Sequence, residues 1–200
     1  MTEPVIEFFW DPVSPYTYLA STRIEALALR VGAVLRWRPF LLGKVLEATG
    51  NRPNIDVPAK GRHMLADLAR WAQHYGVPLV APPIFPISTV TALRAGLAAE
   101  QAGRGPAFAT AVMRAYWGEG RDISQAQTLL AVAAAAGLDG AALLAQTQEP
   151  AIKDALRSNT DEAVRRGAFG APTFFVGEQM FWGNDRLGIL EECLAGDLSA

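Results

Sequence analysis

The chain of 200 residues contains a single cysteine, Cys193, so no disulfide can form within it. With one thiol, it also cannot exchange a dithiol for a disulfide by itself. Such cysteine usage is typical of a reducing compartment, where structural disulfides are rare. Cys193 stands in an amphipathic helical pattern beside acidic residues, which favours a packing role over a reactive thiol. We therefore expect a cytoplasmic protein.

Charge is also sparse and evenly spread. Charged residues make up 19% of the chain, and the net charge is −2. Because no basic block is present to neutralise a nucleic-acid backbone, we expect no nucleic-acid partner. The longest uncharged apolar stretch, residues 129–138, is too short to span a bilayer, and no charged segment followed by an apolar run opens the chain. We expect neither a membrane association nor a secretory signal.

Two familiar kinds of catalytic site are missing. The two histidines, His63 and His74, form no metal-ligand pattern with the cysteine or with each other, so we expect no metal. Neither histidine stands in a motif that identifies the partner of a catalytic triad. Because Ser14 has no Gly-x-Ser-x-Gly motif around it, a serine hydrolase is poorly supported.

The N-terminal part of the chain combines strand and helix patterns. Residues 5–10 are β-branched and aromatic and predict a buried strand. Ser14-Pro15 suits the start of a helix, which we expect to continue through Arg30, with Gly32 ending it. Residues 33–40 alternate and predict a second strand. The pattern therefore predicts a β-α-β unit with parallel strands and a right-handed crossover.

The middle of the chain has no convincing strand. A loop is expected at Gly50-Asn51-Arg52-Pro53 and a proline-rich connector at residues 78–86. Ser124 is expected to cap one of the helices in this part. Helices are predicted over residues 62–75, 89–101, 106–117, 124–136 and 140–146.

After Pro150 the mixed pattern returns. We expect a helix over residues 151–166, a hairpin with its turn at Gly177-Glu178, and a last helix capped by Asn184-Asp185. The strands of the hairpin are predicted over residues 173–176 and 179–182. Without the helical insertion, the order βαβ–αββα is that of the thioredoxin fold, an α/β class. We predict a discontinuous thioredoxin-like domain of residues 1–41 and 150–200, and an insertion domain of residues 42–149.

The turn at Ser14-Pro15-Tyr16-Thr17 joins the first strand to the first helix. Many thioredoxin-like proteins carry Cys-x-x-Cys at this place, whereas Ser14 and Thr17 stand there in this chain. A hydroxyl at the start of a helix can hold and ionise the thiol of another molecule. Ser14 taken alone is better explained as a helix cap.

Two further turns add to this hypothesis. In the thioredoxin order, the proline of Ala171-Pro172 is usually cis and lies beside the first turn. Its predecessor then offers a backbone N–H and C=O to an extended peptide, such as the cysteinyl unit of glutathione. Asn184-Asp185 opens a helix and can cap it, bind the charged end of a γ-glutamyl group, or do both. Asn51 and Lys60 are weaker candidates, because most such loop residues are simply solvated.

Three aromatic residues flank these turns. Trp10, Tyr16 and Trp182 are of types that more often belong to a core. Their positions nevertheless make them candidates for the lining of an aromatic substrate pocket.

Taken together, these motifs resemble the 2-hydroxychromene-2-carboxylate isomerase family, which is grouped with the kappa-class glutathione transferases and the DsbA-like thioredoxin proteins. The resemblance covers nearly the whole chain, including the helical insertion. The motifs that carry it are Ser14-Pro15-Tyr16-Thr17-Tyr18-Leu19-Ala20, Gly50-Asn51-Arg52-Pro53, Pro58-Ala59-Lys60-Gly61, Phe169-Gly170-Ala171-Pro172-Thr173-Phe174 and Phe181-Trp182-Gly183-Asn184-Asp185-Arg186.

The resemblance implies a cytoplasmic homodimer that binds glutathione and a small aromatic substrate. It implies that Ser14 faces the glutathione sulfur. Around the tripeptide it places Asn51, Lys60, the backbone of Ala171 before Pro172, Asn184 and Asp185. The implied reaction opens 2-hydroxychromene-2-carboxylate to trans-o-hydroxybenzylidenepyruvate, a step of naphthalene breakdown. In that reaction the glutathione thiolate adds to the conjugated system, a single bond rotates, and the thiolate leaves.

Two alternatives remain open from the residues. A kappa-type glutathione transferase would use the same residues to conjugate other electrophiles. A non-catalytic thioredoxin-like module would bind peptides along the Pro172 edge.

Overall fold

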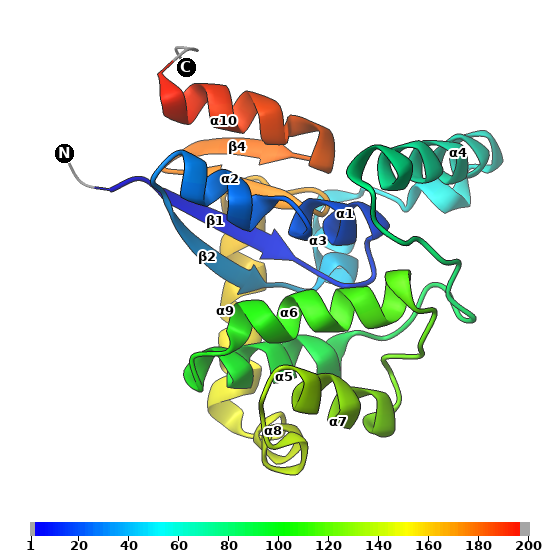
Figure 1. The fold of residues 1–200 in the computed structure, drawn as a ribbon, viewed down its shortest axis with the longest axis vertical. Coiled ribbons are helices and arrows are strands. Elements are labelled where there is room, and N and C mark those ends of the chain that lie inside the picture. Colours follow the sequence, from blue (N-terminus) through cyan, green and yellow to red (C-terminus); the bar gives the residue numbers. More distant parts are fainter. Residues whose placement is uncertain (1–2, 197–200) are drawn as a thin grey trace.

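The structure, a computed structural model, describes residues 3–196. It contains one four-stranded sheet and ten α-helices in that range, and Figure 1 shows α5 to α8 gathered on one side of the sheet while α4 projects beside it. The strands are β1 (Val5–Trp10), β2 (Val34–Pro39), β3 (Thr173–Val176) and β4 (Gln179–Trp182). The helices are α1 (Pro15–Ser21), α2 (Ile24–Arg30), α3 (Leu42–Thr49), α4 (Pro58–Tyr75), α5 (Val90–Gln101), α6 (Gly105–Met113), α7 (Ala126–Ala135), α8 (Gly140–Gln146), α9 (Pro150–Arg165) and α10 (Leu187–Ala195).

The sheet has the order β2-β1-β3-β4. β1 runs parallel to β2 and antiparallel to β3, and β3 and β4 form the predicted hairpin. Phe9 pairs with Thr173, which in turn pairs with Trp182. The ends of β1, β2 and β4 therefore meet the start of β3 at one edge of the sheet. The predicted thioredoxin-like fold is confirmed, and its topology alone brings the three suspected turns together.

The first helix is shorter than expected. The predicted helix through Arg30 is two helices, α1 and α2, with a break at Thr22 and Arg23. The hydroxyl of Ser21 donates to the carbonyl of Tyr18, and that of Thr22 donates to the carbonyl of Leu19, each at 2.7 Å. Adjacent hydroxyls that bond back to the preceding turn compete with the backbone ladder, and here they accompany the end of the helix.

Two predicted caps are wrong. Ser124 donates to Asp122 instead of capping, and α7 begins after Gln125 without a side-chain cap. At the start of α8, Asp139 accepts hydrogen bonds from two backbone N–H groups. Asn184 and Asp185 lie in a short 3₁₀ turn, Asn184–Arg186, that precedes α10, and neither side chain caps that helix.

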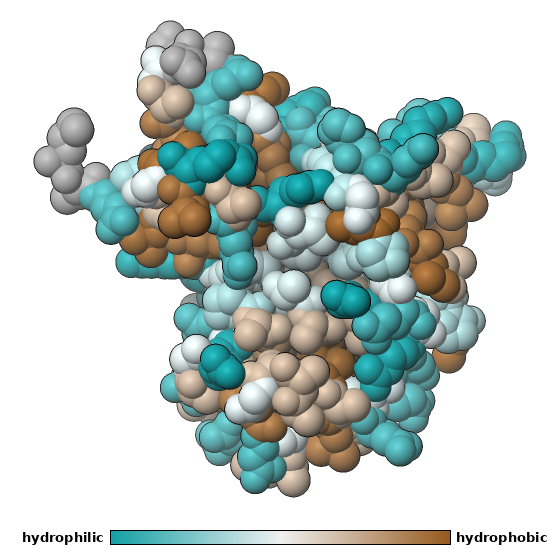
Figure 2. All heavy atoms as spheres, viewed as in Figure 1, coloured by the Kyte–Doolittle hydropathy of each residue, from teal (hydrophilic) through white to brown (hydrophobic). Residues whose placement is uncertain are grey.

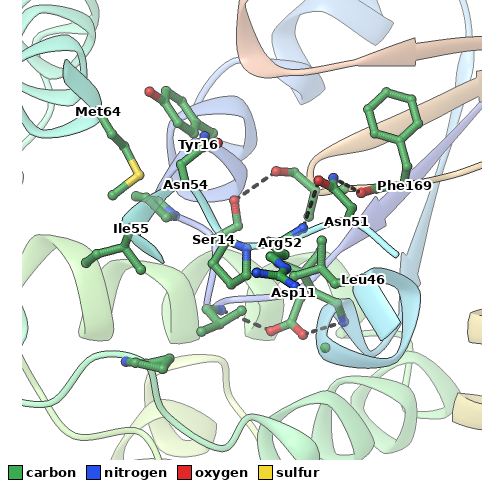
Figure 3. Close-up of a pocket in the computed structure, with 18 of the residues that line it drawn as sticks. Asp11, Ser14, Tyr16, Leu46, Asn51, Arg52, Asn54, Ile55, Met64 and Phe169 are labelled. Carbon is green, nitrogen blue, oxygen red and sulfur yellow. Dashed lines mark hydrogen bonds between the residues drawn. The ribbon is translucent and has the colours of Figure 1, made fainter. Parts of the chain in front are cut away.

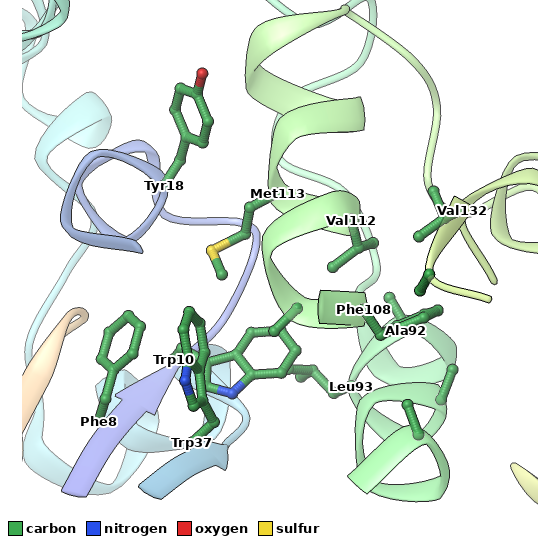
Figure 4. Packing of buried hydrophobic residues seen from close by; sticks show 14 of the residues in the cluster. Phe8, Trp10, Tyr18, Trp37, Ala92, Leu93, Phe108, Val112, Met113 and Val132 are labelled. Carbon is green, nitrogen blue, oxygen red and sulfur yellow. The ribbon is translucent and has the colours of Figure 1, made fainter. Parts of the chain in front are cut away.

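One large apolar cluster joins the sheet to the inserted helices. Figure 4 shows Phe8, Trp10 and Trp37 of the strands facing side chains of α5 and α6, among them Leu93 and Phe108. All five are buried. The helices inserted after β2 therefore share a core with the sheet.

No single helix within residues 3–196 has both the length and the apolar composition to cross a membrane. The bent pair α7 and α8 meets that test only when the two are taken together.

Candidate functional site

A cleft of about 1430 Å³ opens at the edge of the sheet where the three turns meet. Its lining comes from the turn after β1, from α3 and the loop that follows, from α4, from the connector before α5, and from the segments that flank β3 and β4 (Figure 3). Among the candidates from the sequence, those that line it are Ser14, Tyr16, Asn51, Lys60, Ala171, Trp182, Asn184 and Asp185.

Ser14 connects the first turn to the segment before β3. Its hydroxyl donates to the carbonyl of Ala171 at 2.9 Å and accepts from the N–H of Thr17 at 3.3 Å. The peptide bond between Ala171 and Pro172 is cis. Ser14 is therefore a helix cap and a cleft residue at once. Pro172 itself does not line the cleft, and its part is to present Ala171.

Asn51 forms a strut across one side of the cleft. Its Nδ2 donates to the carbonyl of Phe169 at 2.8 Å, and its Oδ1 accepts from the N–H of Arg52 at 2.9 Å. The loop after α3 is thereby tied to the segment that carries Ala171, 120 positions later in the chain.

Trp182 is the last residue of β4, and Asn184 lies in the short turn that follows. Asn184 is only 2% exposed, and its Nδ2 has no hydrogen-bond partner among the described residues. The ring of Trp182 packs against Phe169 with centroids 4.8 Å apart and remains 43% exposed. A Cβ on Gly170 would lie 2.4 Å from Trp182 Nε1, so the backbone approaches this ring too closely for a side chain. Asp185 forms an exposed ion pair with Arg186 at 2.7 Å.

Tyr16 and Lys60 belong to the side of the cleft formed by α4. The hydroxyl of Tyr16 donates to Asp67 Oδ2 at 2.9 Å. Burial and the neighbouring carboxylate both raise the pKa of Tyr16, so its hydroxyl stays protonated. Lys60 lies in the first turn of α4, and Pro58 occupies the first position of that helix.

The prediction for Trp10 is wrong. Its side chain is 1% exposed and lies in the core, not in the cleft. β1 is buried on both faces at this end, and Trp10 packs against α5, where a Cβ on Gly96 would come within 3.0 Å of its ring. Only Tyr16 and Trp182 of the three aromatic candidates reach the cleft.

Asp11 is a cleft residue that sequence reasoning missed. It is 1% exposed, and its carboxylate accepts from the N–H groups of Val13 and Leu42, each at 3.0 Å. The Thr89 side chain also favours the ionised form of Asp11. Burial raises the pKa of Asp11 to about 6, although these hydrogen bonds act in the opposite direction. An aspartate directly after a buried strand, three positions before Ser14, was the available signal.

The inserted segment, through its helices and connecting loops, also supplies an apolar wall that the sequence did not reveal. Its side chains are those of Leu42, Leu46, Ile55, Met64, Phe85 and Ile87. Within residues 3–196, no group of three or more His, Cys, Asp or Glu side chains is arranged to hold a metal ion.

Comparison with known families agrees with this geometry. A family model described as a DsbA-like thioredoxin domain matches residues 5–195. The chain belongs to the DsbA-like thioredoxin family. Unlike a dithiol oxidoreductase, this member has Ser14 and Thr17 at the active turn, and its one cysteine lies in α10.

Two groups of curated relatives match the chain over more than nine tenths of its length. It is 40% identical over 191 residues to 2-hydroxychromene-2-carboxylate isomerase of Sphingobium xenophagum, covering 94% of this chain and 97% of that protein. It is 30% identical over 200 residues to glutathione S-transferase kappa 1 of Rattus norvegicus, covering 93% and 88%. The resemblance inferred from the motifs is confirmed.

Solved structures agree with these sequence relationships. A 2-hydroxychromene-2-carboxylate isomerase superposes with a TM-score of 0.87 at 32% identity, covering 98% of this chain and 100% of that one. The cytosolic disulfide reductase DsbM of Pseudomonas aeruginosa, solved with GSH, superposes with a TM-score of 0.69 at 28% identity, covering 96% of both chains.

Proposed function

We propose that this protein is a glutathione-dependent isomerase that interconverts 2-hydroxychromene-2-carboxylate and trans-o-hydroxybenzylidenepyruvate. The observation that carries the proposal is the hydrogen bond from the Ser14 hydroxyl to the carbonyl of Ala171. It places a hydroxyl, instead of a thiol, beside a backbone edge that is suited to an extended peptide. Curated relatives that are 40% and 34% identical to the chain carry the isomerase name and support the enzyme class.

The cleft residues fit glutathione. The Ala171 backbone suits the cysteinyl unit, because a strand-like peptide pairs with a backbone N–H and C=O. The Ala171 N–H has no acceptor among the described residues, and its C=O, which accepts from Ser14, is also placed to accept from a peptide N–H. The orphaned Nδ2 of the buried Asn184 is a donor that lacks an acceptor within the described chain, and a ligand carboxylate would satisfy it. Lys60 and Asp185 supply charges of both signs in the same lining, as a zwitterionic ligand requires. Bound glutathione supplies a sulfur nucleophile that can add to a conjugated system and leave again.

Ser14 has a specific task in this scheme. Its proton points to the Ala171 carbonyl, and a peptide N–H that pairs with that carbonyl would release the Ser14 proton for a sulfur. A free thiol has a pKa of about 8.5, so it is mostly protonated at pH 7. A hydrogen bond to a charged acceptor contributes about 1.5–3 kcal/mol, which is about one to two pKa units. One serine is therefore sufficient to make a useful fraction of thiolate.

The Ser14→Ala variant tests this task. With glutathione at saturation, we expect the thiol pKa of the complex to be about one to two units higher than in the wild type, because the donor to the sulfur is gone. The measurement is the ultraviolet absorption of the thiolate as a function of pH. Ser158→Ala, at an exposed position of α9, is the matched control and should leave the curve unchanged. An unaltered thiol pKa in Ser14→Ala would refute the role of the serine.

The reaction is tested by incubating 2-hydroxychromene-2-carboxylate with the enzyme and glutathione. An isomerase returns the opened isomer and leaves free glutathione undiminished. The second candidate, favoured by the kappa-class relatives, is a glutathione transferase, for which a stable conjugate would accumulate as glutathione disappears.

The proposal extends to a cytoplasmic homodimer. A lone cysteine fits a reducing compartment. Exposed apolar side chains around α4 and the connector after it, Ile55, Val57, Leu65, Val80 and Ile84, are available for a subunit contact. Figure 2 shows apolar side chains gathered on this side of the molecule. Light scattering coupled to size exclusion tests the dimer, and a mass of 21.5 kDa at all concentrations would refute it.

A further inference from the structure

The proposed reaction has a second ligand, and its carboxylate needs a partner in the cleft. We propose that Arg52 binds the carboxylate of the aromatic substrate and thereby selects anionic aromatic compounds over neutral ones. This inference rests on the proposed function, because it places the second substrate in the same cleft as glutathione.

The balance of charges in the cleft leaves Arg52 available. The lining has five acidic side chains, and four of them have partners: Asp11 accepts from backbone N–H groups, Glu47 pairs with Lys44, Asp67 accepts from Tyr16, and Asp185 pairs with Arg186. The fifth, Asp56, has no ion-pair partner among the described residues. Among the described residues, Arg52 forms no ion pair and no side-chain hydrogen bond. A guanidinium in that state is a ready donor for a carboxylate, which it binds through two parallel hydrogen bonds.

The backbone of Arg52 is held in place by its neighbours in the loop. Asn51 accepts from the N–H of Arg52 at 2.9 Å and donates to the carbonyl of Phe169 at 2.8 Å. Pro53 follows with its restricted φ of −56°. The backbone of Arg52 is thus tied to the segment that presents Ala171, so the point from which the guanidinium extends is fixed relative to Ala171. Such preorganisation lowers the ordering cost of binding.

The surroundings suit an aromatic acid more than a purely polar one. Arg52 belongs to the lining residues drawn in Figure 3, which also include the apolar Leu46 and Ile55 as well as Ser14. An apolar wall beside an unpaired cation recognises a flat apolar body that carries one negative group. The other cation without an ion pair in the described lining, Lys60, is the one already proposed for glutathione.

The test separates the two ligands. The variants are Arg52→Gln and Arg52→Lys, with Arg62→Gln as control, because Arg62 is exposed on α4 and does not line the cleft. With glutathione saturating, we expect Arg52→Gln to raise KM for 2-hydroxychromene-2-carboxylate about 10- to 100-fold while kcat changes less than threefold. Arg52→Lys should be intermediate, because a point charge replaces a fork. Glutathione affinity should stay within twofold of wild type in all three, and the thiol pKa within about 0.3 unit.

A direct binding measurement keeps the inference independent of turnover. By calorimetry on the glutathione complex, the wild type should bind 2-naphthoate at least tenfold more tightly than 2-naphthamide, and Arg52→Gln should bind both equally. If the wild type prefers the acid but does not isomerise the chromene, the proposed reaction fails and the role of Arg52 stands. Equal preference in wild type and Arg52→Gln, the same loss in Arg62→Gln, or a loss of glutathione binding in Arg52→Gln would each overturn the inference.

Discussion

Asp11 shows how one side chain holds the cleft together. Its carboxylate accepts from Val13 in the turn after β1 and from Leu42 at the start of α3, and the side chain of Thr89, just before α5, helps to lower its pKa. Three segments that are distant in sequence therefore share one buried group. A carboxylate in such a place is costly when ionised and is retained only if its hydrogen bonds compensate for the lost solvation.

Asp11 should make stability depend on pH. Its folded-state pKa is about 6, above the ordinary value of 3.8, so the folded protein binds this proton more tightly than the unfolded chain. The contribution of the group is fully present below pH 3.8 and is lost as the pH rises through about 6. The full loss is about 3 kcal/mol, from 1.36 kcal/mol per pKa unit.

The measurement compares the free energy of unfolding of wild type and Asp11→Asn between pH 4 and 7. Subtracting the variant cancels the other titrating groups, and the difference, wild type minus variant, should fall by up to about 3 kcal/mol as the pH rises. Asp161→Asn, at an exposed position of α9, should give a flat difference. A flat or rising difference for Asp11→Asn would contradict the raised pKa.

At the scale of elements, local sequence signals worked where an element is stabilised locally. The hairpin was predicted with its strand bounds and with Gly177, whose φ of 57° suits glycine. α3 was missed because its start has no cap in the neighbouring sequence. The N–H of Leu42 is satisfied by Asp11, 31 positions earlier, and this contact exists only after folding.

The candidate site also depends in part on contacts that form only after folding and that the sequence does not show. The topology of the sheet follows from the order of strand and helix patterns, and it brings Ser14, Ala171 and Asn184 to one edge. On a strand that is buried on both faces, apolar and polar residues do not alternate, so the sequence does not show which way a side chain points. For this reason the sequence prediction places Trp10 in the cleft instead of the core. The apolar wall depends on how α3 and α4 pack, which no short motif encodes.

The contact between α5 and β1 gives a prediction at this scale. A Cβ on Gly96 would meet two ring atoms of the buried Trp10 at 3.0 Å. Gly96→Ala should therefore lower the free energy of unfolding by about 1–2 kcal/mol, since overpacking outweighs the gain in helix propensity. Gly188→Ala in α10 has open space around its Cβ and should be neutral or stabilising by up to about 1 kcal/mol. Denaturant unfolding measures both, and equal stability of the two variants would contradict the close packing.

For the whole molecule, the division into residues 1–41 with 150–200 and residues 42–149 stays a prediction, and the shared core bears on what it means. Among the described residues, α5 and α6 of the insertion pack in one apolar cluster with the sheet. Leu93 and Phe108 belong to the same cluster as Phe8 and Trp10. The two units should therefore unfold together, even though one interrupts the other in sequence.

Phe108→Ala tests this coupling, because Phe108 is fully buried in α6, within the insertion. It should cost about 3–5 kcal/mol, as expected for a phenylalanine removed from a packed core. In native-state hydrogen exchange, peptides from β1 and from α6 should lose protection by the same free energy, because both exchange through global unfolding. Leu130→Ala, at a partly exposed site of α7, should cost less than about 1 kcal/mol. If α6 lost its protection while β1 kept the wild-type value, the insertion would open independently, and the cleft wall could then move without the sheet.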